Sequence, residues 1–182
     1  MSIRKPVRKM ALVAIATLAV AIVVPTVTAS AGPNELSKAR AGTARYHDIK
    51  TALASGYGLF TDKDGIACID KPGVGAMGIH YVNGTQVGDP TENAATPEAV
   101  VYEPNSHGRL RMVALEYVVL KADWEADGNN APPSLFGESF MLIPSPNRYG
   151  LPDFYALHAW IGKHNPSGMF AMWNPVVHCP AG

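Results

Sequence analysis

The N-terminal thirty-one residues place the strongest constraint on what this chain can fold into. Four basic residues stand among the first nine positions: Arg4, Lys5, Arg8 and Lys9. A fifteen-residue apolar run, Met10–Val24, follows them, and then come the small residues Ala29-Ser30-Ala31. This order is typical of a secretory signal peptide, and the run is shorter than the ~20 residues that span a bilayer. We therefore expect residues 1–31 to be a cleaved signal peptide and residues 32–182 to fold after secretion, in a periplasm or outside the cell.

The exported part has the size and charge of a single acidic domain. Removing residues 1–31 from a chain of 182 leaves 151 residues, enough for one domain with its own hydrophobic core. The full chain has 15 basic and 15 acidic residues, and four of the basic residues lie in the predicted signal peptide. The exported part therefore has 11 basic and 15 acidic residues, and its net charge is −4 with histidine neutral. A nucleic-acid partner requires a basic surface that neutralises phosphates. We expect no nucleic-acid partner, and no membrane partner after signal cleavage.

Two cysteines, Cys68 and Cys179, stand in the exported part. In an oxidising compartment an isolated pair is expected to form a disulfide. Closing a loop of roughly 110 residues would stabilise the fold by ~4 to 5 kcal/mol in the chain-entropy account. The alternative is a zinc site that joins both thiolates to histidines, but the close Cys-x-x-Cys spacing of such sites is absent from the sequence. The sequence thus favours a Cys68–Cys179 disulfide.

The order of apolar and turn-forming segments predicts an α+β fold. The spacing of apolar residues in Ala39–Ser55 indicates one amphipathic helix, after an exposed leader over Gly32–Arg40. A polar loop is expected over Asp123–Pro133, which is rich in Gly, Asn and Pro. Strands are expected over 57–64, 76–82, 99–103, 111–120, 140–143 and 153–161. The fold class that follows is an N-terminal helix on a curled antiparallel β-sheet, a small barrel or roll, with one disulfide.

The C-terminal third carries a pattern of short motifs: Leu157-His158-Ala159-Trp160, Asn165–Phe170, Trp173-Asn174-Pro175 and Cys179. This pattern resembles the ending of a family of small secreted bacterial proteins of uncharacterised function. Gly75–Asn83 and the hairpin Glu103–Tyr117 are similar to the same family, so the resemblance covers most of the exported chain. The resemblance implies export and a single domain, and it assigns no catalytic residue.

Three ionisable side chains, His80, Glu116 and His158, stand in the middle of predicted strands where only apolar ones are expected. Burying such a group costs several kcal/mol unless a partner, a proton or a metal compensates for it. If the strands are neighbours and share a face, two imidazoles and one carboxylate converge, as in the facial arrangement that binds Fe(II), Mn(II) or Zn(II). The leading hypothesis is a secreted protein that binds one divalent metal ion (Fe, Mn or Zn) and could act as a mononuclear metal-dependent enzyme.

The alternative hypothesis is a structural network of the same polar residues. A buried histidine can bond to a carbonyl or a glutamate, and an inward glutamate can pair with Arg109 or Arg111. Glu103 and His164 are substitutes within the candidate cluster if the register differs, because a one-residue slip moves a side chain to the other face. The protein would then be a non-catalytic domain that binds a small molecule or glycan. The residues expected to stack on that ligand are Trp160 and Trp173.

Overall fold

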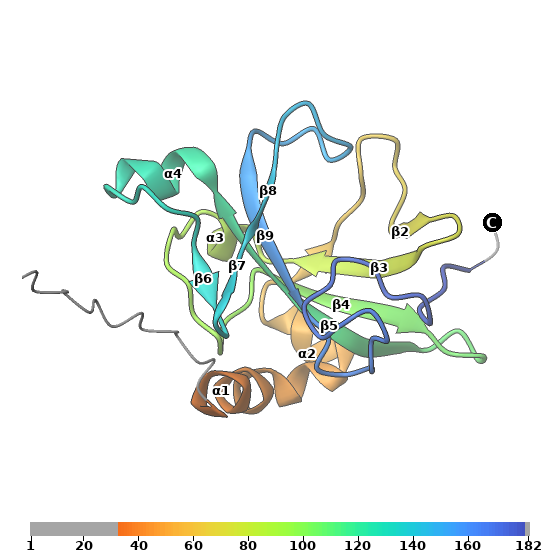
Figure 1. Cartoon of the computed structure of the whole chain (residues 1–182). Helices are drawn as coiled ribbons and strands as arrows, with labels where there is room; N and C mark the ends of the chain where they lie inside the picture. The colour runs from red at the N-terminus through yellow and green to blue at the C-terminus, as the bar shows by residue number, and fades with distance from the viewer. Residues whose placement is uncertain (1–32, 181–182) are drawn as a thin grey trace, which may run out of the picture.

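A computed structural model describes residues 33–180, and it confirms the α+β fold class (Figure 1). Helices lie at the N-terminal end of this range, and an antiparallel sheet follows them along the chain. The predicted signal peptide, residues 1–31, lies outside the described residues. Within the described range, no helix has the length and apolar character that crossing a membrane requires.

The N-terminal helical region has three pieces, α1 (Pro33–Thr43), the 3₁₀ turn η1 (Ala44–His47) and α2 (Ile49–Ala54). The prediction of one helix over Ala39–Ser55 is therefore wrong, as is that of an exposed leader before it. The interruption falls at Asp48, whose carboxylate accepts a hydrogen bond from the backbone N–H of Lys50 at 3.0 Å. Aspartate favours this capping position over a helix interior, so it begins a new helix.

Seven strands form one antiparallel sheet in the order β1-β3-β4-β5-β9-β8, and β2 pairs with a further part of β3. Their bounds are Gly58–Leu59 (β1), Cys68–Lys71 (β2), Gly75–Val82 (β3), Ala99–Pro104 (β4), Leu110–Leu120 (β5), Met141–Ile143 (β8) and Phe154–Ala159 (β9). The path begins at β1 and ends at β8, so the sheet is open and not a closed barrel.

The remaining elements are short and lie around the sheet. The strands β6 (Ser134–Leu135) and β7 (Glu138–Ser139) pair with each other in a separate ribbon. The helix α3 (Gly84–Val87) follows β3, and α4 (Lys121–Ala126) follows β5. The helix α4 overlaps the segment that was predicted as a loop, so that prediction holds only for the residues after it.

The two faces of the sheet have different surroundings. One face, which we call the helix face, carries large buried side chains such as Tyr102 and Leu115 and packs against the N-terminal helices. The opposite face, which we call the site face, carries Val101 and Ala114 and packs against residues near the C-terminus. Side chains alternate between the faces along each strand, so neighbours in sequence enter different environments.

The C-terminal segment is tied to β2 and β3 at two points. The predicted disulfide is confirmed, because Cys68 in β2 is bonded to Cys179 with 5.6 Å between their Cα atoms. Ala76 and Asn174 exchange two backbone hydrogen bonds, of 3.1 and 3.0 Å. The segment that follows β9 is therefore held against the site face, as the blue trace in Figure 1 shows.

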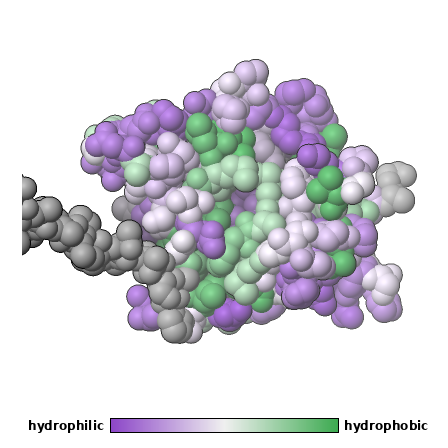
Figure 2. Space-filling view, viewed as in Figure 1, coloured by the Kyte–Doolittle hydropathy of each residue, from purple (hydrophilic) through white to green (hydrophobic). Residues whose placement is uncertain are grey.

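Hydrophobic side chains also reach the surface. Figure 2 shows them in a band through the middle of the face in view, over the region where β8 and β9 lie in Figure 1. In β8, Met141 is 55% exposed and Leu142 is 41% exposed. This end of the sheet is less fully covered than the central strands β4 and β5.

Candidate metal centre

Strand register brings the three predicted ligands to one place on the site face. Glu116 in β5 lies directly opposite His158 in β9. His80 in β3 lies opposite Val101 in β4, which in turn lies opposite Ala114, two residues before Glu116. Residues that face each other across a ladder share one face of the sheet. Three strands thus each supply one ionisable side chain, and β4 between them supplies only apolar side chains at this level.

The donor atoms of the three side chains lie close together. Nε2 of His80 is 3.2 Å from Oε2 of Glu116 and 3.4 Å from Nε2 of His158, and Nδ1 of His158 is 3.6 Å from Oε1 of Glu116. One ligand atom from each residue can be chosen so that all lie within 4.8 Å of one another. Two metal bonds of ~2.1 Å at a tetrahedral angle hold their donors roughly 3.4 Å apart. The two contacts of His158 use different ring nitrogens, and with one nitrogen chosen the three side chains lie close enough that they could hold one metal ion.

Burial and mutual attraction set the charges in this cluster. His80 is 4% exposed and His158 is 2% exposed, and the side chain of Glu116 is 12% exposed. Burial raises the pKa of Glu116, but attraction to the charges of His158 and His80 and a hydrogen bond with His80 outweigh burial and lower the pKa to about 2. Burial lowers the pKa of His158 to about 4, against the attraction of Glu116. At neutral pH the carboxylate is ionised and His158 is neutral, which are the forms that bind a metal.

Neighbouring groups hold the histidines in place. The backbone carbonyl of His80 accepts a hydrogen bond from the N–H of Phe60 at 2.9 Å, while β4 pairs along the other edge of β3. The ring of His158 stacks on Trp160 at 5.9 Å between ring centres, with 17° between the planes. Trp160 is 3% exposed and donates its indole N–H to the carbonyl of Ala171. Trp160 thus packs against a candidate ligand and offers no exposed surface.

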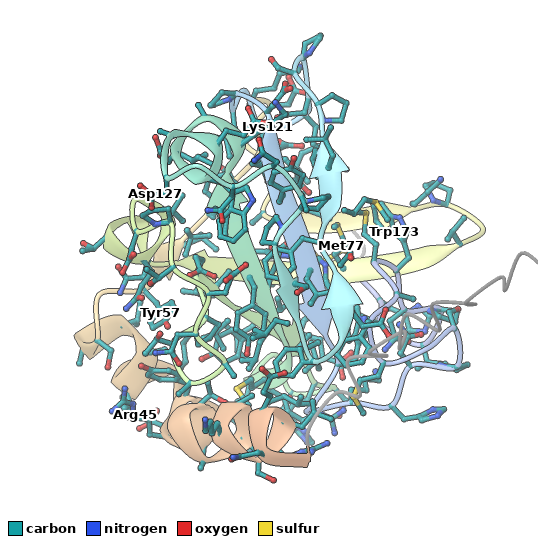
Figure 3. The ribbon with its side chains drawn as sticks, turned by 60° about the vertical axis from the view of Figure 1, so that its left-hand side comes forward. Arg45, Tyr57, Met77, Lys121, Asp127 and Trp173 are labelled. Atoms are coloured by element: carbon teal, nitrogen blue, oxygen red, sulfur yellow. A yellow bond between two sulfur atoms is a disulfide. The ribbon has the colours of Figure 1, made fainter. Side chains whose placement is uncertain are left out.

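Two cavities meet at the carboxylate of Glu116. The first cavity, of about 380 Å³, reaches His80 and Glu116 between β1, the start of α3 and the loop before β9. The second cavity, of about 280 Å³, reaches Glu116 from the side of the C-terminal segment and is lined by Met77 and Trp173, which lie next to each other in Figure 3. Of the two tryptophans predicted to stack on a ligand, Trp173 is the one that lines a cavity at the site.

The loop between β8 and β9 supplies a residue that sequence reasoning missed. Tyr149 lines both cavities, and its hydroxyl lies 3.7 Å from the sulfur of Met77. Burial and the charge of Glu116 raise the pKa of Tyr149, so the hydroxyl keeps its proton. The neighbouring Arg148 binds Asp62 through Nε and Nη2, at 3.2 and 2.7 Å, and thereby fixes the loop. Nothing in the sequence around Tyr149 except a nearby proline-rich turn marks this residue.

The substitutes Glu103 and His164 do not reach the centre. Glu103 lies on the site face beyond Val101 and binds Lys163 at 2.6 Å and Arg111 at 3.0 Å. His164 is exposed in the segment after β9. Arg111 therefore pairs with Glu103 and not with Glu116. Within residues 33–180, Glu116 forms its ion pairs with the two histidines alone.

Comparison of the chain with protein-family models, with curated proteins and with solved structures finds no match. The function therefore has to be inferred from the site itself.

Proposed function

We propose that this chain is an exported metal-binding protein in which His80, Glu116 and His158 bind one divalent metal ion, Fe, Mn or Zn. The observation that carries the proposal is the convergence of three ligand atoms, from three separate strands, within 4.8 Å. Two imidazoles and one carboxylate are the donor set of many mononuclear Fe(II), Mn(II) and Zn(II) sites. Binding of a metal ion is also a physical reason for burying three ionisable groups together.

The surroundings of the cluster support a catalytic role. Three protein ligands leave coordination positions for water or a substrate. The first cavity gives a small molecule access to His80 and Glu116. A metal ion at this place could polarise a bound carbonyl or activate a water molecule, which makes metal-dependent hydrolysis or oxygenation the two reaction classes to test.

Export is the second part of the proposal. The disulfide fits an oxidising compartment, where such bonds persist. The basic and apolar order of residues 1–31 fits a cleaved signal. Intact-mass measurement and N-terminal sequencing of the protein from a culture supernatant or periplasm should give a chain that begins at Gly32. A chain that keeps residues 1–31 would contradict export by this route.

The decisive experiment measures the metal content of the purified protein. Elemental analysis should find close to one equivalent of Fe, Mn or Zn in the wild-type protein. It should find a large loss in His80→Gln and Glu116→Gln, both checked for folding by circular dichroism. His164→Gln is the matched control, because this histidine is exposed and outside the cluster, and it should keep its metal. A wild-type protein without metal, even after anaerobic reconstitution with each ion, would refute metal binding.

A second candidate function is a ligand-binding domain with structural histidines. Its support is that the cluster can satisfy itself, since in residues 33–180 every buried side-chain nitrogen and oxygen has a hydrogen-bond partner. Trp173 at the second cavity would then be the residue that contacts the ligand. This function predicts no metal in the wild-type protein and quenching of tryptophan fluorescence by the bound ligand, which Trp173→Leu should abolish.

A further inference from the structure

We infer that the first cavity binds a small, uncharged and mainly apolar molecule, whose single polar group points to His80 and Glu116. The inference rests on the proposed function, because that function supplies the metal ion that the polar group would contact. The apolar part of the inference stands on the cavity alone. It narrows the substrate of the candidate enzyme to one chemical class.

The lining of the first cavity sets the polarity of its occupant. Apolar side chains make up most of the wall: Leu59, Phe60, Val82, Val87, Val118 and Leu151. Among the described residues, no lysine or arginine lines the cavity, and the ionisable groups other than Tyr149 that do so are His80 and Glu116. A phosphate, a carboxylate or a sugar would lose its hydration here without gaining enough partners. An apolar body gains free energy by leaving water for the same wall.

The polar groups of His80 and Glu116 lie next to each other, so they set the orientation of a bound molecule. Nε2 of His80 and Oε2 of Glu116 are 3.2 Å apart at one place on the wall. A ligand with one polar end therefore has one orientation that pairs this end and buries the rest. The cavity volume of about 380 Å³ is near the small end of the ~300 to 1,000 Å³ of ligand pockets. The occupant is thus a molecule with one ring or a short alkyl chain.

Two glycines on the cavity wall, Gly58 and Gly84, keep it open. A Cβ atom built on either residue has no neighbouring heavy atom within 4 Å. Neither glycine has the positive φ that disfavours other residues, so the backbone does not require glycine at these positions. A larger side chain has open space at either position, and at Gly58, which lies opposite Val82 on the same face as His80, it would enter the cavity. These positions therefore provide a test that avoids the proposed metal ligands.

The test uses three probes that separate the ring from the donor: 4-fluorobenzohydroxamic acid, acetohydroxamic acid and 4-fluorotoluene. The first carries both a ring and a metal-binding group, the second only the metal-binding group, and the third only the ring. Titrations into the zinc-loaded protein are followed by NMR. We expect 4-fluorobenzohydroxamic acid to bind at least tenfold more tightly than acetohydroxamic acid. Equal affinity for these two would overturn the inference.

The matched variants are Gly84→Phe and Thr85→Phe, which add the same ring at adjacent positions of α3. Gly84 lines the cavity, whereas Thr85 is exposed and does not. Gly84→Phe should weaken the binding of both ring-bearing probes at least tenfold and keep its metal, and Thr85→Phe should change neither. Gly58→Leu provides a second position in case Gly84→Phe fails to fold. Unchanged binding of 4-fluorotoluene to both glycine variants would refute the cavity as the binding site.

The failure of this inference can be told apart from the failure of the proposed function. If the wild-type protein binds no metal, the hydroxamate group adds nothing to affinity, and the proposed function is refuted. The cavity would still have to bind 4-fluorotoluene and lose it in Gly84→Phe. If metal is present but the ring adds no affinity, the metal site stands and the apolar substrate class is refuted.

Discussion

The helix face and the site face of the same sheet differ in how completely side chains fill the space beside them. On the helix face, large apolar and tyrosine side chains fill the space, and the hydroxyls of Tyr102 and Tyr117 each donate to a backbone carbonyl at 2.7 and 2.8 Å. On the site face, alanines at 99, 114 and 156 share the face with the ionisable cluster, and two cavities reach Glu116. Full packing stabilises a fold, whereas a functional site needs space and polar groups that a ligand can reach. The helix face therefore supplies stability, and the site face can supply function.

The largest expected effect is on the helix face, at Leu115, which is fully buried. Leu115→Ala should lower the free energy of unfolding by about 3 kcal/mol, because it removes apolar burial and leaves a cavity. Urea unfolding measures the loss, and the folded variant should retain its metal content. Leu53→Ala, at a residue that is 50% exposed, is the control and should change stability by less than about 0.5 kcal/mol. Metal loss in Leu115→Ala would break the separation between the faces.

Glu98 is an exception on the helix face, because it is a buried carboxyl group. It precedes β4, is 3% exposed, and accepts a hydrogen bond from the N–H of Val118 at 2.9 Å. Burial raises the pKa of Glu98 to about 8, in spite of hydrogen bonds from Val118 and its own backbone, and the charges of Asp89 and Glu116 act in the same direction as burial. The folded protein therefore holds a proton here that the unfolded chain releases above pH 4.5, its ordinary pKa.

The second prediction follows from this raised pKa. The contribution of Glu98 to stability is complete below pH 4.5 and is lost as pH rises through 8. At about 1.4 kcal/mol for each pKa unit, the loss is at most about 5 kcal/mol, and we expect about 2 to 3. Glu98→Gln, which keeps the size and stays neutral, should be more stable than the wild-type protein at pH 9 by this amount and equal to it at pH 4. A difference that does not change with pH would contradict the buried proton.

The third prediction concerns His158 on the site face, where stability is lost as the pH falls and not as it rises. The pKa of His158 is about 4 in the folded protein and 6.5 ordinarily, so its contribution to stability is complete above pH 6.5 and is lost as pH falls through 4. Metal-free protein should lose about 1 to 2 kcal/mol of stability over this range, and His158→Gln should lose less. Denaturant unfolding at several pH values after chelation measures both, with His164→Gln as the control that follows the wild type. Parallel curves for His158→Gln and the wild-type protein would contradict a neutral His158.

The strands that carry the site could be predicted, and their arrangement could not. Apolar runs bounded by turn-forming residues indicate β3, β5 and β9, and the polar residues in their middles stand out as anomalies. Strand order is a long-range property, so the placement of β9 beside β5, with His158 opposite Glu116, required the structure. The same holds for Tyr149, whose role comes from the way its loop folds back over the site face.

Local signals were also misjudged where two of them compete. The predicted helix over Ala39–Ser55 runs through Asp48, although an aspartate that accepts a hydrogen bond from a following backbone N–H caps a new helix. Small and charged residues before Arg40 suggested an exposed leader, but α1 forms there and packs Ala39 and Leu36 against the core. Glu98 gave no signal, since a carboxyl next to a strand is usually solvated.

The fourth prediction has the smallest expected effect, and it compares the two glutamates of the site face, Glu103 and Glu116. Glu103 is held by Lys163 and by Arg111, whose side chains are 21% and 55% exposed, whereas the ion pairs of Glu116 in residues 33–180 are with histidines only. Arg111→Gln should cost less than about 1 kcal/mol, because Lys163 still compensates the carboxylate and an exposed ion pair contributes little. Urea unfolding measures this change, and elemental analysis should find the metal content unaltered.

This variant is informative because both glutamates were candidates for the same ligand position. A carboxylate with fixed cationic partners has no physical need of a metal ion, whereas one surrounded by imidazoles gains from binding one. If Arg111→Gln lost its metal, Glu103 would be coupled to the centre and the choice of Glu116 as the sole carboxylate ligand would be wrong. The expected result is that Arg111→Gln keeps its metal and Glu116→Gln loses it. In that case the cationic neighbours of Glu103 explain why Glu116, and not Glu103, is the metal ligand.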